Sequence, residues 1–251
     1  VNLAVGFCAM QSNLTGTSNT AIGANALETN TTGTDNTVVG RSAMAKTTTG
    51  LCNTAMGGNA LACNTTGCYN TAHGRDALCA NTTANNNTAV GLSALKVNTT
   101  GAANTGVGKD SLAANTTGDG NTAVGLRSGF ANQTSDSNTS MGQDSLRCNT
   151  GGSNTAIGRN ALESNTTGTT NVAVGVNSLI ANTTGAGNTA VGNLALDANT
   201  TANDNTAVGR CALTTNITGA NNVAVGAYSL RDSTGSDNVA VGAGSALVNT
   251  G

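Results

Sequence analysis

The sequence contains no proline, no tryptophan and a single histidine, and charged residues make up only 9% of it. About 25% is typical of soluble domains. Ten basic residues against twelve acidic residues form no basic patch, so we expect no nucleic-acid partner. No apolar run approaches the roughly 20 residues that cross a bilayer, so we expect no membrane insertion. An initiator methionine and a signal peptide are also lacking, and we interpret the chain as a mature or excised piece of a longer protein.

Large apolar residues are scarce as well. Leu, Ile, Val and Phe make up about 17% of the 251 residues, below the roughly 20% that a packed core needs. The net charge of −2 is too small for a typical disordered chain. A chain made largely of Asn, Thr, Gly and Ala therefore either stays unfolded or gains order from repetition.

A seventeen-residue repeat covers the whole chain. Its unit reads N-T-A-V-G-x-x-A-L-x-x-N-T-T-G-x-x, and we number its positions 1 to 17, so that Asn19 is position 1 and Gly23 is position 5. There are fifteen units, two of which (138–153 and 222–237) are shorter by one residue. Position 5 is always Gly, and position 9 is Leu or Met except at Gly129 and Ala246. So strict a register excludes a disordered tract.

This pattern predicts an all-β fold: a parallel β-solenoid (β-roll) of fifteen coils of about 17 residues, with two short strands per coil. Seventeen residues are too few for a helical repeat, and Asn, Gly and β-branched residues disfavour helix. The first strand is N-T-A-V, ended by a Gly that turns sharply or adopts positive φ. The second runs through A-L toward the turn residues of N-T-T-G. We expect one continuous solenoid over residues 1–251, a segment of a longer fibre, with a length of roughly 70 Å at about 4.8 Å per coil.

Each repeat position becomes a column along a solenoid. We expect the position-1 amides to stack as a hydrogen-bonded ladder. The Asn-Thr-Thr triplets, such as residues 30–32, match an N-glycosylation acceptor, but we favour a structural interpretation because the same turn chemistry generates the triplet. The structural columns include Asn19, Asn36, Asn53, Gly23, Gly40, Gly57, Leu27 and Leu61.

Positions 3 and 4 predict an assembly face. Adjacent strand residues point to opposite faces, yet both positions are mostly apolar. A strand that is apolar on both faces is usually covered on both. The simplest cover outside the coil is another copy of the chain, in a homotrimer or a head-to-tail filament. The predicted assembly face contains Val5, Ile22, Val90, Val107, Val124 and Ile157.

The unit resembles the head repeats of trimeric autotransporter adhesins, whose N-S-V-A-I-G-x-x-S strings form left-handed β-rolls packed as trimers. Residues 238–245, N-V-A-V-G-A-G-S, are the nearest match. The unit also looks like the shaft repeats of some bacteriophage tail fibres. The resemblance implies a surface fibre with structural and adhesive duties. Because the unit here is longer and no stalk or anchor is visible, the membrane-anchored topology of the adhesins does not carry over.

The seven cysteines suggest disulfides. Cys52 and Cys68 are one residue closer in sequence than a full repeat, as are Cys63 and Cys79, which places each pair on neighbouring coils. The spacing of neighbouring strands lies inside the disulfide window of about 4.4–6.8 Å between Cα atoms. We therefore predict these two bridges, in an oxidising extracellular setting. The remaining cysteines are either small buried apolar residues, which we favour slightly, or bonds between chains: Cys8, Cys148 and Cys211.

We find no catalytic constellation. His73 occupies position 4 between Met56 and Val90, which indicates a tolerated substitution. Acidic residues beside the turns are too sparse for a calcium roll, although occasional ions at Asp204 or Asp237 stay open: Asp35, Asp119, Asp136, Asp204 and Asp237. We expect no metal and no cofactor.

Four functions compete. We expect a non-enzymatic structural or adhesive protein of an extracellular fibre at a cell surface, which associates with itself and contacts host or surface ligands. A phage tail-fibre shaft, on the virion surface, is the second hypothesis. Ice binding through the Thr of position 2, present in eleven units such as 19–35, is the third. A solenoid enzyme such as a polysaccharide lyase is the least favoured, because acids and histidine are few.

Overall fold

The computed structural model describes residues 1–246, which contain no helix and fifteen short strands. The strands are parallel and stack as a β-solenoid of about fourteen coils of ~17 residues. The predicted fold class is therefore confirmed. Fifteen sequence units yield about fourteen coils, one fewer than expected.

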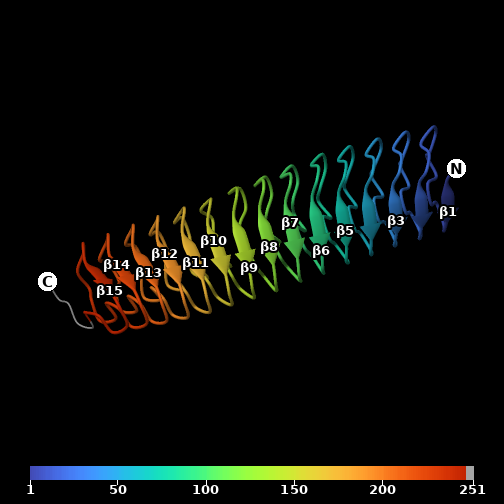
Figure 1. The fold of residues 1–251 in the computed structure, drawn as a ribbon. Coiled ribbons are helices and arrows are strands. Elements are labelled where there is room, and N and C mark those ends of the chain that lie inside the picture. The colour runs from blue at the N-terminus through green and yellow to red at the C-terminus, as the bar shows by residue number, and fades with distance from the viewer. Residues whose placement is uncertain (247–251) are drawn as a thin grey trace. The chain divides into compact units, whose positions relative to one another are not determined.

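The chain divides into two compact units, Val1–Asn121 and Thr122–Gly251. In each unit the strands pair in sequence order, one strand per coil (Figure 1). The first unit contains β1 (Leu3–Val5), β2 (Thr20–Ile22), β3 (Thr37–Val39), β4 (Thr54–Met56), β5 (Thr71–His73), β6 (Thr88–Val90) and β7 (Thr105–Val107). The second contains β8 (Thr122–Val124), β9 (Thr139–Met141), β10 (Thr155–Ile157), β11 (Val172–Val174), β12 (Thr189–Val191), β13 (Thr206–Val208), β14 (Val223–Val225) and β15 (Val239–Val241). That residues 1–251 form a single domain stays a prediction.

The expected second strand is absent from the described coils. Positions 6 to 11 form turns, in which positions 7 and 9 take left-handed backbone conformations, as at Asn25 (φ 57°) and Leu27 (φ 52°). Two left-handed residues so close together prevent an extended strand. Neighbouring coils still hydrogen-bond here, because the Leu27 amide donates to the Ala43 carbonyl at 3.0 Å. The A-L segment therefore stacks without being a strand.

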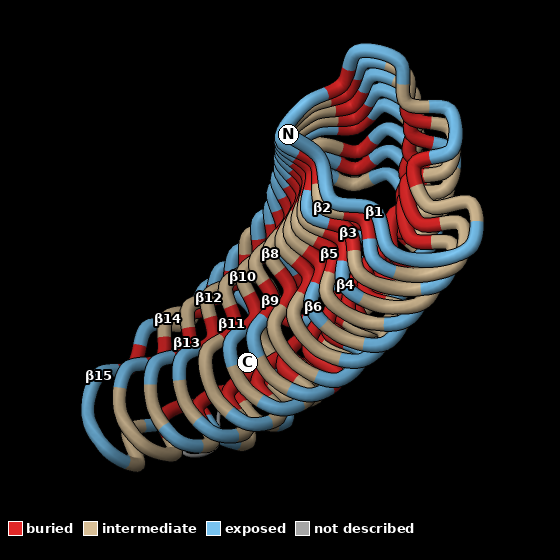
Figure 2. Tube along the Cα trace, turned by 90° about the vertical axis from the view of Figure 1, so that its right-hand side faces the viewer, coloured by how far each residue is buried: buried red, intermediate tan, exposed pale blue. Residues whose placement is uncertain are grey.

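The core is a narrow stack of small and branched residues. Alanine at positions 3 and 8 and leucine at position 9 point inward, and Ala21, Ala26 and Leu27 are fully buried. Figure 2 shows buried residues on the inside of the coils and exposed ones on the outside. Each buried leucine contributes about 1.5–3 kcal/mol. One leucine or methionine in nearly every coil, repeated along the stack, explains how a chain with few large apolar residues folds.

The two shortened units keep the register of the strands. Ala156 pairs with Ser140 even though they are one residue closer in sequence than a full repeat. Both short units lack position 14, the second Thr of N-T-T-G. Elsewhere, position 14 is exposed, and in several units its amide shares an acceptor with position 13: the amides of Thr99 and Thr100 both donate to the Thr116 carbonyl, at 2.9 and 3.2 Å. The two short units therefore lack the residue whose backbone hydrogen bond goes to an acceptor that its neighbour already uses.

We therefore expect deletion of Thr100 to change the free energy of unfolding by less than about 1 kcal/mol. Deletion of the buried Ala94 in the same coil should lower it by more than about 3 kcal/mol, because the leucine that follows would leave its column. Chemical denaturation of the two variants measures the difference. Equal losses would contradict the redundancy of position 14.

Candidate assembly face

The outward side of the strands forms a stripe in each compact unit. Position 3 faces the core, so positions 2 and 4 point away from it. We call the residues at positions 2 and 4 of each strand the outward face. Position 4 is Val, Ile or Met in every strand except β5, where it is His73. The predicted assembly residues lie here: Val5 (52% exposed), Ile22 (38%), Val90 (36%) and Ile157 (38%), with Val107 and Val124 partly exposed.

No Asp, Glu, Lys or Arg side chain lies on the outward face of the strands β1 to β15. All Lys, Arg, Asp and Glu residues occupy positions 6, 7, 10, 11, 16 or 17, which are turns. Position 2 adds threonine, whose side chain presents a methyl group and a hydroxyl. The face is therefore a repeating array of methyl groups and hydroxyls, with a long exposed apolar column that an isolated surface rarely shows.

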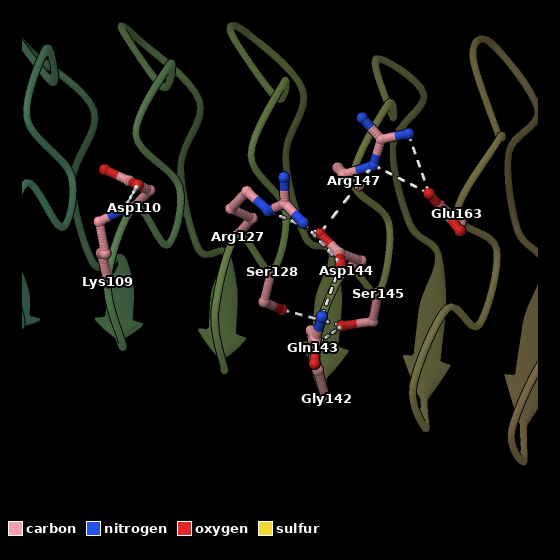
Figure 3. A network of polar contacts seen from close by, with 10 residues as sticks. All are labelled: Lys109, Asp110, Arg127, Ser128, Gly142, Gln143, Asp144, Ser145, Arg147 and Glu163. Atoms are coloured by element: carbon pink, nitrogen blue, oxygen red, sulfur yellow. Dashed lines mark hydrogen bonds and ion pairs between the residues drawn. The ribbon is translucent and has the colours of Figure 1, made fainter.

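Charged side chains pair with one another on the turns of the second unit (Figure 3). Arg127 contacts both carboxylate oxygens of the buried Asp144, at 2.9 Å through Nε and 3.0 Å through Nη2. Arg147 contacts Glu163 Oε1 at 2.9 Å. This network was not predicted from the sequence. The signal was present, because Arg127 and Asp144 have opposite charges at position 7 of neighbouring units.

Buried amide ladders hold the coils in register beneath the face. Asn36 Nδ2 donates to Asn19 Oδ1 at 3.1 Å, and Asn53 Nδ2 donates to Asn36 Oδ1 at the same distance. Each oxygen also accepts the backbone N–H of the next position-1 residue, at 3.0 Å in both cases. The position-1 amide thus joins two coils through side chain and backbone together.

Position 12 forms a second ladder, which bears on glycosylation. Asn30 is fully buried, and its Nδ2 donates to Asn13 Oδ1 at 2.7 Å and to the Gly33 carbonyl at 3.1 Å. An oligosaccharide attaches to this nitrogen. This nitrogen is buried and occupied by two hydrogen bonds. The folded coil therefore fits a structural role of the Asn-Thr-Thr triplet and leaves no room for an attached oligosaccharide.

The cysteine predictions need correction. All seven cysteines are free, and no pair lies at disulfide distance. Two cysteines share a column only when they are a full repeat apart, and each predicted pair is one residue short of that, so its members lie in adjacent columns. Cys68, for example, aligns with Leu51, whose amide donates to Cys68 Sγ at 3.4 Å. Cys63 and Cys79 are displaced in the same way. Burial chiefly, then Cys63 and Asp76, raise the pKa of the Cys79 thiol.

The other cysteines and the acidic residues have unremarkable surroundings. Cys8, Cys148 and Cys211 are each partly buried, and a bond between chains stays a prediction. Asp119 Oδ1 accepts the Ala102 amide at 2.6 Å, and Asp237 Oδ1 accepts Asn221 Nδ2 at 3.0 Å, so both cap neighbouring coils. Among residues 1–246, no three His, Cys, Asp or Glu side chains come together to hold a metal ion.

Comparison with family models and with curated proteins gives no match for this chain. In the part of the chain that the structure describes, no helix is long and apolar enough to cross a membrane.

Proposed function

We propose that the protein is a non-enzymatic structural and adhesive component of an extracellular fibre, assembled from β-solenoids that pack through the outward face. The apolar residue at position 4 of nearly every strand, exposed in most strands and partly exposed in the others, is the observation that carries this proposal. A second copy is the occupant that fits best. To match the face over many coils, a partner needs the same repeat of about 4.8 Å, and another copy of this chain has it.

The energetics favour association over many coils at once. Full burial of a valine contributes about 1.5–3 kcal/mol, and the position-4 side chains are roughly one-third exposed, so each adds about 0.5–1 kcal/mol. The loss of translational and rotational freedom on association costs about 4–15 kcal/mol, which opposes this gain. A contact of two or three coils is therefore too small, whereas the seven strands of the first unit or the eight of the second reach the lower part of that range.

Lysine substitution on the face tests the proposal. Val191→Lys and Val208→Lys each place a charge in the column, where both valines are 36% exposed. Val176→Lys is the matched control, because Val176 is 39% exposed but lies on a turn. In sedimentation velocity the wild type and the control should form the same oligomer, and the two face variants should be monomers with unchanged melting temperature. A monomeric wild type, or face variants that assemble normally, would contradict the proposal.

Ice binding is a second candidate, and the free hydroxyls of position 2 favour it. Thr20, Thr54 and Thr88 make no side-chain hydrogen bond within the described chain, which leaves these hydroxyls for water. A regular array of them on an uncharged sheet could order water. Thermal hysteresis in a monomeric wild type, abolished by Thr189→Lys, would favour this function over the fibre.

The location of the fibre needs its own experiment. We propose a cell surface on the resemblance of the repeats to adhesin heads, with a virion as the alternative. Antibodies raised against the chain should decorate intact, unpermeabilised cells in electron micrographs. Decoration of phage tails instead would favour the tail-fibre shaft.

A further inference from the structure

His73 is the single titratable side chain on the outward face. It occupies position 4 of β5, directly paired with Met56 of β4 and with Val90 of β6. Both neighbours are exposed apolar residues, at 45% and 36%. Histidine is the side chain whose charge normally changes between about pH 5 and 8. An otherwise uncharged face therefore has one place where pH can introduce a charge.

The surroundings of His73 offer no compensating charge on this face. Strands β4 and β6 contain only Thr, Ala, Met and Val, and the turns that follow them begin with Gly57–Gly58 and Gly91–Leu92. The charged groups closest in sequence, Arg75 and Asp76, lie on the next turn and pair with each other at 3.4 Å. Asp76 also accepts a hydrogen bond from Asn59, at 3.0 Å. An imidazolium on the face would thus lack a free acidic partner.

His73 Nε2 is buried and has no hydrogen-bond partner. A neutral imidazole can leave this nitrogen without a proton, whereas in an imidazolium both nitrogens are donors and each needs an acceptor. A protonated His73 satisfies Nε2 by turning the ring toward water, which moves the charge outward onto the face.

We propose that protonation of His73 disassembles the fibre, which makes self-association through the outward face dependent on pH. This inference rests on the proposed function. In a symmetric contact the same patch of each copy takes part, so every copy adds one charge to the interface. Burying these charges without partners opposes association. Assembly should be strong at pH 7.5 and weaken as pH falls and the imidazole takes up its proton.

Sedimentation velocity of the full chain at pH 7.5 and pH 5.5 tests the inference, with His73→Val, which restores the usual position-4 residue, as the matched variant. The wild-type dissociation constant should rise by about tenfold or more at pH 5.5, while that of His73→Val stays constant. His73→Lys should be monomeric at both pH values and retain the wild-type circular dichroism spectrum.

Three results would count against the switch. If wild type and His73→Val assemble equally at both pH values, the switch is absent and the fibre proposal stands. If both lose assembly to the same extent at pH 5.5, other groups cause the effect and His73 has no such role. If no variant assembles at any pH, the proposed function fails and this inference fails with it.

Discussion

Replacement of Gly57 by alanine should lower the free energy of unfolding by roughly 3–5 kcal/mol, although it adds a single methyl group. Gly57 has φ +137°, a conformation that is essentially restricted to glycine. A Cβ at this position would lie 2.6 Å from both the carbonyl carbon and the oxygen of Gly74 on the next coil. Both atoms are backbone, so the clash can be relieved only by separating β4 from β5.

Gly58 supplies the control for this prediction. It is the next residue in the chain, its φ is not in the positive region, and the nearest atom to an added Cβ is the Arg41 carbonyl oxygen at 4.0 Å. Gly58→Ala should change stability by less than about 0.5 kcal/mol. Urea denaturation followed by circular dichroism compares the two. If Gly57→Ala were as stable as Gly58→Ala, the close approach of neighbouring coils would not require glycine at position 5.

The column structure was predictable because a fixed period specifies which residues become neighbours. In-register stacking follows from the spacing alone, so the buried Asn19 and the inward Leu27 could be placed without coordinates. The same reasoning failed for the cysteines, where a separation one residue short of the period was treated as equivalent to the period itself. One residue of shift moves a side chain to a neighbouring column that points elsewhere.

The absence of the predicted second strand could not be inferred from the sequence. Leucine is a poor residue for the left-handed region, which disfavours side chains by roughly 1–2 kcal/mol, so nothing in the A-L segment indicates a turn. At Leu27 the burial of the side chain offsets that strain. Packing thus overrides local preference at one position in nearly every coil, and only the three-dimensional structure reveals it.

The second prediction with a large effect concerns the position-1 ladder. Asn188→Leu should lower the free energy of unfolding by about 2–4 kcal/mol, because it leaves the buried Asn205 amide unpaired at about 1–3 kcal/mol and removes the Nδ2 bonds to the Ala202 carbonyl and to Asn171 Oδ1 on the preceding coil. Asn188 Nδ2 donates to the Ala202 carbonyl at 2.8 Å, and Asn188 Oδ1 accepts the Asn205 amide at 3.0 Å. Leucine has a similar shape without polar atoms, so it excludes the water that a smaller side chain would admit.

Two companion variants separate the hydrogen bonds from the change in composition. Asn193→Leu, a little further along the same coil, replaces an exposed asparagine and should alter stability by less than about 0.5 kcal/mol. Asn188→Asp retains an oxygen for the Asn205 amide and replaces the donor to Ala202 by a second oxygen, so as long as pH keeps the carboxyl ionised it places a buried charge against a carbonyl. Its stability should therefore recover as the pH falls and the carboxyl regains a proton, whereas that of Asn188→Leu should show no such recovery. Equal stability of Asn188→Leu and Asn193→Leu would mean that the position-1 hydrogen bonds form in the folded protein without contributing to its stability.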